Sequence, residues 1–186
     1  MKTLLQNARC IVTCDDNDSI LRGADVLMED GVIAAIGHLG AVQADEIVDA
    51  SRLILYPGLI NTHHHLYQYF TRNLRHVQNL ELFDWLTALY DIWAHLNEDT
   101  VRLSSLSGMG ELMKYGCTTC FDHHYVFPNG AGDLLAAQFS AAESLGIRMV
   151  SSRGSMSLSR KDGGLPPDTV VQTTDEILRD SREAIE

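Results

Sequence analysis

The chain has 186 residues, of which 45% are apolar, and a formal net charge of −11. This apolar content is sufficient for a buried core, so the chain is expected to be globular. The negative charge disfavours binding to nucleic acid or to an anionic membrane surface, because both are polyanions. A small neutral or cationic molecule is the expected partner, and self-association into a homo-oligomer is left open.

Three features of the sequence predict a cytoplasmic protein. No apolar run approaches the roughly 18 residues that a membrane span requires. The first residues include Gln6, Asn7 and Arg9, where a secretory signal would be apolar. The four cysteines are too few for a disulfide scaffold in a chain of this size.

Residues 1–56 predict the N-terminal part of a small β domain of the sandwich type. Two apolar runs, Ala24–Met28 and Val32–Ile36, flank Asp30-Gly31, a dipeptide that suits a two-residue hairpin turn. Pro57-Gly58 then punctuates the sequence and marks the end of this region. Further strands are predicted at Ala8–Cys14 and Arg52–Tyr56.

Residues 57–186 show short apolar runs alternating with segments of helical period, a pattern typical of βα units on a parallel sheet. Three such units are predicted, whereas a closed barrel of this kind needs eight. The fold class is therefore α/β, in a chain that stops in mid-pattern. Either it is the N-terminal part of a (β/α)8 barrel, or the fold ends in an unusual way. The predicted strands are Gly58–Thr62, Thr118–Phe121 and Ile147–Ser152, and the predicted helices are Leu80–Leu96, Glu98–Tyr115, Asp133–Leu145 and one that opens with a capping box at Thr173–Glu176.

Three consecutive histidines follow the first of these strands. Residues two apart on a strand point to the same face, so His63 and His65 are predicted to converge on one metal ion while His64 points away. Two imidazoles at this spacing satisfy the roughly 2.0–2.1 Å bond length of zinc, at the strand end where active sites of such barrels lie. The alternative is a group of ordinary loop histidines.

The pair Cys117 and Cys120 matches C-x-x-C, which would suit a redox or structural zinc site. A spacing of three places the two thiols on opposite faces of a regular strand, so this interpretation is disfavoured.

The segment Pro57–His65 resembles the signature of the amidohydrolase superfamily at its first barrel strand. The continuation through Phe83-Asp84-Trp85-Leu86, Thr118–Tyr125 and Arg153–Ser157 is similar to the cytosine-deaminase-like branch, and closest in appearance to 8-oxoguanine deaminases and to triazine aminohydrolases and chlorohydrolases. The resemblance covers nearly the whole chain.

The resemblance implies one zinc ion, or an iron ion, held by His63, His65 and two further residues of later strands. It also implies hydrolytic deamination of an amino-substituted nitrogen heterocycle, with the acid and base residues expected beyond Glu186. Gln68, in the loop after the first strand, is expected to contact the substrate ring, because a side-chain amide can both donate and accept. The alternative is a solvated loop residue. The 186-residue chain alone is expected to be inactive.

Other residues near the strand ends have two interpretations each. Arg153 is a candidate for binding a polar substrate group or for pairing with a buried carboxylate such as Asp122. His123 and His124 face opposite sides, so at most one points into the barrel, and a supporting role is expected for both. Trp85 could stack on a flat ring, but its place in an apolar helical stripe favours packing.

Two further hypotheses stay open. The chain could serve as a non-catalytic metal-binding or oligomerisation module, since two histidines fill only half of a tetrahedral shell. A hydrolase that removes chloride from a triazine is a variant of the deaminase hypothesis that only product analysis would distinguish.

Overall fold

The computed structural model describes residues 1–185, which divide into two compact units, Met1–Pro57 and a second one that begins at Gly58. In this described part, no helix is long and apolar enough to cross a membrane. The two units are taken in turn.

The first unit contains two small sheets. A four-stranded sheet has the order β5-β4-β1-β6, and a three-stranded sheet has the order β3-β2-β7. Apolar side chains of both sheets, among them Ala8, Ile11 and Val26, pack in one buried cluster, as the sandwich prediction requires. The strands are β1 (Lys2–Ala8), β2 (Cys10–Val12), β3 (Ile20–Leu21), β4 (Ala24–Glu29), β5 (Val32–Gly37), β6 (Glu46–Asp49) and β7 (Ile54–Leu55).

The predicted hairpin is confirmed as β4 and β5. Asp30 and Gly31 have φ angles of 49° and 84°, the positive values that a two-residue hairpin turn needs. The single strand predicted over Ala8–Cys14 is wrong, because the chain leaves the first sheet after Ala8 and β2 begins in the second sheet at Cys10.

A buried carboxylate connects the irregular end of β1 to the loop after β5. Asp25 accepts hydrogen bonds from the backbone N–H of Asn7 (2.7 Å) and of Leu39 (3.0 Å). These two donors, Asn7 first, lower the pKa of Asp25 below its ordinary value of 3.8.

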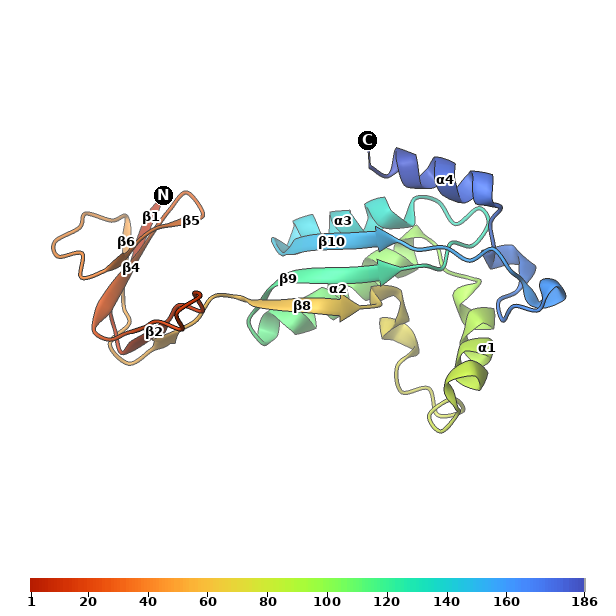
Figure 1. Ribbon diagram of the computed structural model, residues 1–186, viewed down its shortest axis with the longest axis horizontal. Helices are drawn as coiled ribbons and strands as arrows, with labels where there is room; N and C mark the ends of the chain where they lie inside the picture. Colours follow the sequence, from red (N-terminus) through yellow and green to blue (C-terminus); the bar gives the residue numbers. More distant parts are fainter. Residues whose placement is uncertain (186) are drawn as a thin grey trace. The chain divides into compact units, whose positions relative to one another are not determined.

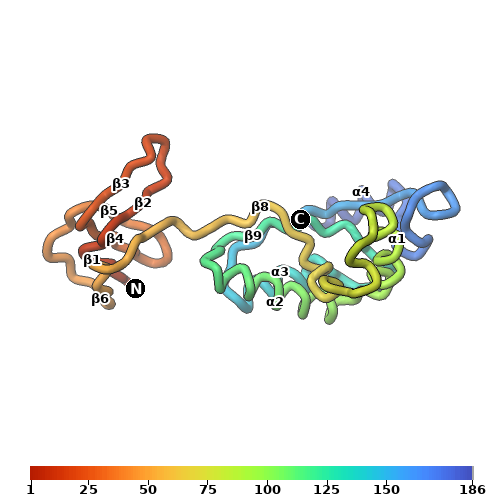
Figure 2. Tube along the Cα trace, turned by 90° about the horizontal axis from the view of Figure 1, so that it is seen from below, coloured from red at the N-terminus to blue at the C-terminus, as the bar shows by residue number. Residues whose placement is uncertain are grey.

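The second unit is a parallel sheet of order β10-β9-β8 with helices on one face (Figures 1 and 2). Helices α2 and α3 pack against each other and against β9 and β10. The other face carries exposed apolar side chains such as Ile60 and Val150. The elements are β8 (Leu59–His64), α1 (Leu82–Trp93), α2 (Glu98–Lys114), β9 (Cys117–His124), α3 (Leu134–Leu145), β10 (Arg148–Arg153) and α4 (Thr174–Glu183), with short 3-10 helices at Leu66–Thr71, Arg160–Asp162 and Asp168–Val170.

The helix boundaries follow local capping chemistry. Asn97 and Thr100 form a capping box at the start of α2, and Thr173 and Glu176 form the predicted one at the start of α4. Gly146 ends α3 in the left-handed conformation, with φ of 73°. The predicted helices are therefore confirmed to within about two or three residues at each end.

The pairing of β8 with β9 is irregular at two places. Leu59 pairs with Cys117 but Ile60 pairs with Thr119, so Thr118 is an extra residue on β9. The extra residue reverses the alternation, and Cys117 and Cys120 both lie buried in the cluster between the sheet and helices α2 and α3. The expectation that the two thiols face opposite sides is wrong.

Both cysteines are nevertheless free thiols. Burial, with smaller contributions from Asp122 and Cys117, raises the pKa of Cys120 to about 12. A redox or metal-binding thiolate needs a lowered pKa, so the C-x-x-C motif acts here as core packing.

Candidate metal centre and substrate cavity

His63 and His65 converge at the carboxyl end of β8. Their Nε2 atoms are 3.2 Å apart, and their rings meet edge to face. His64 points to the helix layer, where its Cε1 lies close to Gly108 of α2. The pairing of β8 with β9 is irregular a second time here, because Asn61 pairs with Cys120 and His64 with Asp122. Three residue steps on β8 thus lie opposite two on β9, and Asn61 and His64 both face the helices. The structure thus brings together the two predicted ligands and separates the third histidine.

The two histidines fit a shared metal ion. Two nitrogens bound to one tetrahedral zinc ion at about 2.0–2.1 Å lie about 3.3 Å apart, close to the separation found. Among the described residues, no third histidine, cysteine or carboxylate joins them in a group that could hold a metal. Half of a tetrahedral shell is therefore present in this part of the chain.

The ring of His65 is fixed by a main-chain group. Its Nδ1 donates to the backbone oxygen of His123 at 2.7 Å, a bond that leaves the lone pair on Nε2 available for a metal. The His123 ring lies 5.3 Å from the His65 ring, and burial lowers the pKa of His123 below 6.5. Of the two histidines that end β9, His123 is the one beside the metal site.

A cavity of about 410 Å³ opens beside these histidines. It is lined by His63, His65, Gln68 and Trp85, with polar residues of the 66–78 segment around them. Trp85 also packs edge to face on Trp93, which is fully buried. The structure therefore gives Trp85 both positions that the sequence left open, because its ring packs on the core and also faces the cavity.

Gln68 lies in the 3-10 helix that follows His65. Its Nε2 donates to the hydroxyl groups of Tyr67 (3.2 Å) and Tyr125 (3.4 Å). Burial, with Tyr125 adding to it, raises the pKa of Tyr67 above its ordinary value, so this hydroxyl stays protonated. The amide group is held at the cavity wall, and contact with a substrate ring stays a prediction.

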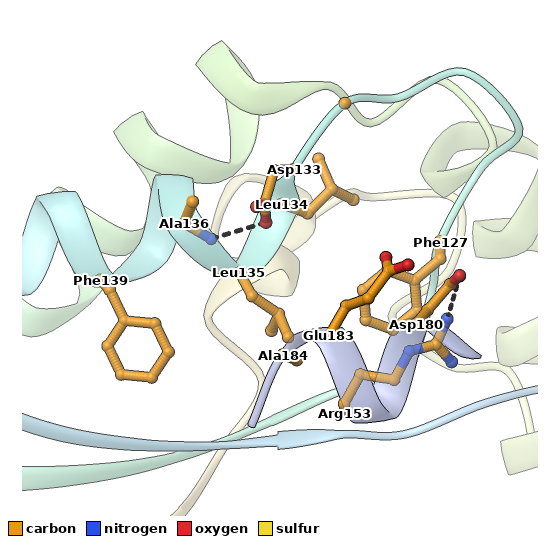
Figure 3. Close-up of a pocket in the computed structure, with 11 residues that line it drawn as sticks. Phe127, Asp133, Leu134, Leu135, Ala136, Phe139, Arg153, Asp180, Glu183 and Ala184 are labelled. Atoms are coloured by element: carbon orange, nitrogen blue, oxygen red, sulfur yellow. Dashed lines mark hydrogen bonds and ion pairs between the residues drawn. The ribbon is translucent and has the colours of Figure 1, made fainter. Parts of the chain in front are cut away.

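Arg153 lies elsewhere. Its guanidinium group pairs with Asp180 of α4 at 3.1 Å and stacks over the Phe127 ring (Figure 3). It also donates to Gln172 Oε1 and to the backbone oxygen of Gly154. Arg153, Asp180 and Phe127 line a different cavity, between α3 and α4. Pairing with Asp122 is wrong, and the position found makes Arg153 an anchor for α4; substrate binding by this residue stays an untested prediction.

His124 belongs to the core. Its side chain is fully buried, and Nε2 donates to the backbone oxygen of Val126 at 2.9 Å. Nδ1 is buried without a hydrogen-bond partner among the described residues. Burial is the main cause that lowers the pKa of His124 to about 4.

Two contributors to the site carry no recognisable sequence signal. Tyr125, just past the end of β9, lies 5.4 Å from the His65 ring and supports Gln68. Gly154 brings the chain against the site, since a Cβ atom there would lie 2.6 Å from Tyr125 Cβ and 2.9 Å from the oxygen of His124. A close approach of this kind becomes visible only in three dimensions.

Comparison with known proteins agrees with this architecture. 8-Oxoguanine deaminase from Pseudomonas aeruginosa is 41% identical over 187 residues, which cover 99% of this chain and 41% of that protein. Hydroxydechloroatrazine ethylaminohydrolase from Pseudomonas sp. strain ADP is 37% identical, over 98% of this chain and 41% of that protein. The chain thus spans about two fifths of the length of these relatives.

Solved structures show the same fold. Atrazine chlorohydrolase from Arthrobacter aurescens TC1, crystallised with zinc, superposes with a TM-score of 0.91 at 29% identity, over 98% of this chain and 42% of that structure. This confirms the predicted fold class, the N-terminal part of an amidohydrolase barrel preceded by a small β domain. Residues 54–186, which include His63 and His65 at the end of β8, match the model of the Amidohydrolase family, and the chain belongs to that family.

Proposed function

We propose that this chain carries the first metal-binding strand and part of the substrate cavity of a hydrolase that removes an amino group from a nitrogen heterocycle. The observation that carries the proposal is the convergence of His63 Nε2 and His65 Nε2, 3.2 Å apart, on a cavity that also presents Gln68 and Trp85. The names of the two sequence relatives, a purine deaminase and a triazine aminohydrolase, support this class of reaction.

The chemistry follows from the residues present. Zinc held by imidazoles lowers the pKa of a coordinated water molecule toward roughly 7 and so supplies a nucleophile at neutral pH. His63 and His65 would hold the metal, with His65 oriented by the His123 carbonyl. Gln68 is placed to bond to the edge of a planar ring, and the Trp85 ring offers a flat apolar wall.

Zinc is the proposed metal, supported by the zinc-containing structure of the related chlorohydrolase, with ferrous iron as the alternative. Because that relative is a chlorohydrolase, release of chloride from a triazine stays an alternative reaction for this site. A cytoplasmic location, a closed eight-stranded barrel and a homo-oligomeric state stay predictions from the sequence.

Metal binding is tested first, on the 186-residue chain. Zinc affinity is measured by competition with a chromophoric chelator for the wild type, His63→Ala and His65→Ala. Each substitution should weaken binding at least about tenfold, because it removes one of two ligands. His95→Ala removes an exposed histidine outside the site and should leave the affinity unchanged. Equal affinities in all four proteins would contradict the proposed site.

Catalysis is tested in a chimera in which this chain replaces the aligned N-terminal segment of the Pseudomonas aeruginosa deaminase. Zinc-dependent release of ammonia from 8-oxoguanine, abolished by His63→Ala, is expected. The 186-residue chain alone should release none. A folded, zinc-loaded chimera that releases chloride from a chlorotriazine but no ammonia would favour the chlorohydrolase, and one that releases neither would favour the binding module.

A further inference from the structure

A fully buried carboxylate lies directly behind the metal-binding strand. Asp122 of β9 has no exposed surface, and each of its oxygens accepts one hydrogen bond. Oδ1 accepts from the backbone N–H of Leu66 at 2.6 Å, and Oδ2 accepts from Nε2 of Gln138 at 2.7 Å. Gln138, on α3, is also fully buried, and its Oε1 accepts from the Ser151 hydroxyl of β10 at 3.3 Å. One network therefore connects strands β9 and β10, helix α3 and the first residue of the 3-10 helix that follows His65.

The Leu66 bond acts at the residue after a metal ligand. His65 is the N-cap of the 3-10 helix Leu66–Thr71, and its own side chain makes no capping bond. The first N–H groups of a helix lack partners within the helix and need an acceptor from elsewhere. The Asp122 carboxylate provides that acceptor from the neighbouring strand, so it sets the direction in which the chain leaves His65.

Consecutive residues of β9 thus hold His65 at two points. The His123 carbonyl accepts from the His65 ring, and the Asp122 carboxylate accepts from the main chain immediately after it. A ring bond alone fixes the plane of an imidazole but not the position of its backbone. The second bond removes that freedom.

We propose that Asp122, itself held by Gln138, is a positioning residue that places His65 for metal binding. The proposal rests on the metal site of the proposed function. Burial of this carboxyl group is weak evidence for a role in stability alone, because apolar side chains of similar volume in place of buried charged groups often stabilise a core as well or better. A network in which every member is bonded, by contrast, fixes one geometry.

Substitution of Asp122 by asparagine and by alanine separates the two roles. In Asp122→Asn, the amide oxygen keeps the Leu66 bond, and Gln138 can flip its amide so that its oxygen faces the new NH₂ group and its nitrogen faces the Ser151 hydroxyl. In Asp122→Ala, the Leu66 N–H loses its partner. The asparagine variant should therefore rescue what the alanine variant loses.

Two measurements on the 186-residue chain test this. The zinc dissociation constant should rise about 10- to 100-fold in Asp122→Ala and change less than about threefold in Asp122→Asn, the range found when support of a ligand is removed. A metal-free ¹H–¹⁵N imidazole spectrum should show the His65 Nδ1–H signal in the wild type and in Asp122→Asn, but exchange-broadened in Asp122→Ala.

Two further variants control for general destabilisation. Val101→Ala truncates a fully buried side chain of α2 that belongs to the core cluster of Trp93, not to the cluster of Cys117 and Cys120. It should leave zinc affinity unchanged. Gln138→Leu keeps the Leu66 bond but removes the donor to Oδ2, and it should weaken zinc binding about 3- to 10-fold. This variant also serves as the test if Asp122→Ala does not fold.

Wild-type zinc affinity in folded Asp122→Ala, or in Gln138→Leu, would overturn the proposal. So would an equal loss of affinity in Val101→Ala, since that result would indicate general destabilisation. If His65→Ala binds zinc as well as the wild type, the proposed metal site fails instead. The imidazole spectrum then still decides whether Asp122 orients His65, because it is recorded without metal.

Discussion

Because His124 is buried in its neutral form, the second unit is expected to lose stability as the pH falls below 6.5, before most carboxylates begin to titrate. Its Nε2–H is used by the Val126 carbonyl, and Nδ1 is buried among the rings of Tyr67 and Phe127. A proton on Nδ1 would be a buried charge without an acceptor. The nearby cation of Arg153, and then His65 and His123, disfavour protonation further.

The sign and size follow from linkage. Burial lowers the pKa of His124 to about 4 in the folded state, against 6.5 in the unfolded chain. The unfolded state therefore binds the proton first, and the stabilisation is complete above pH 6.5 and is lost as the pH falls toward 4. A difference of this size corresponds to about 3 kcal/mol of unfolding free energy.

The assay compares the wild type with His124→Gln, whose side-chain amide can still donate to Val126 but cannot take up a proton. Both tryptophans, Trp85 and Trp93, lie in the second unit, so urea unfolding followed by tryptophan fluorescence reports on this unit alone. Between pH 7.5 and pH 4.5 the wild type should lose about 2–3 kcal/mol relative to the variant. His95→Gln, at an exposed histidine, should run parallel to the wild type.

Parallel curves for the wild type and His124→Gln would refute this reasoning, because they would mean that protonation of His124 costs no more in the folded state than in the unfolded one. An equal effect in His95→Gln would refute it as well, by assigning the pH dependence to histidines in general.

Three more predictions concern the core, the first unit and the back of the site. Trp93→Ala, which removes a fully buried ring, should cost about 3–5 kcal/mol in urea unfolding, whereas Phe83→Ala on the exposed side of the same helix should cost less than about 0.5 kcal/mol. Asp25, whose carboxylate accepts from two backbone amides, should have a pKa below 3.8 in a ¹³C-detected carboxyl titration. Its stabilisation of the first unit is therefore present above pH 3.8 and is lost as the pH falls through the pKa of the folded state. A pKa at or above 3.8 would contradict the two hydrogen bonds. Gly154→Ala should cost about 1–3 kcal/mol and weaken zinc binding, because the added Cβ atom meets backbone and Cβ atoms that cannot rotate away, whereas Gly110→Ala, with open space around it, should stabilise α2 by up to about 1 kcal/mol.

The parts of the fold that the sequence predicts are those set by local chemistry. The Asp30-Gly31 turn needs positive φ angles, and the α4 capping box satisfies its own backbone groups, so both can be identified without knowing what packs nearby. The paired histidines belong to the same class. Residues two apart face the same side of a strand, so the spacing of His63 and His65 alone predicts that they converge. In the structure their Nε2 atoms are 3.2 Å apart.

The parts that it does not predict depend on a partner strand. The irregular pairing at Thr118 is a property of β8 and β9 together, so the faces of Cys117 and Cys120 could not be read from their spacing. Strand β6 is four residues long with acidic residues at both ends, and it exists because β1 pairs with it. Its sequence alone shows no alternation.

Long-range polar bonds are the least visible in the sequence. The partner of Arg153 is Asp180, 27 residues further along the chain, whereas the carboxylate expected to pair with it, Asp122, accepts from Leu66 and Gln138 instead. Residue type predicts that a buried charge needs partners, but only the fold selects them.

This selection bears on how a two-histidine site binds metal. Two neutral imidazoles contribute no charge to neutralise the ion and only half of a tetrahedral shell, so affinity depends strongly on how much freedom the rings must lose. The second unit removes that freedom from the β9 side: the His123 carbonyl fixes the tautomer and plane of the His65 ring, and the Asp122 carboxylate fixes the chain behind it. The main-chain acceptor survives any side-chain substitution at His123, whereas the carboxylate does not survive substitution at Asp122. Variants at these adjacent positions should therefore differ: His123→Ala should retain the His65 Nδ1–H signal, and Asp122→Ala should lose it.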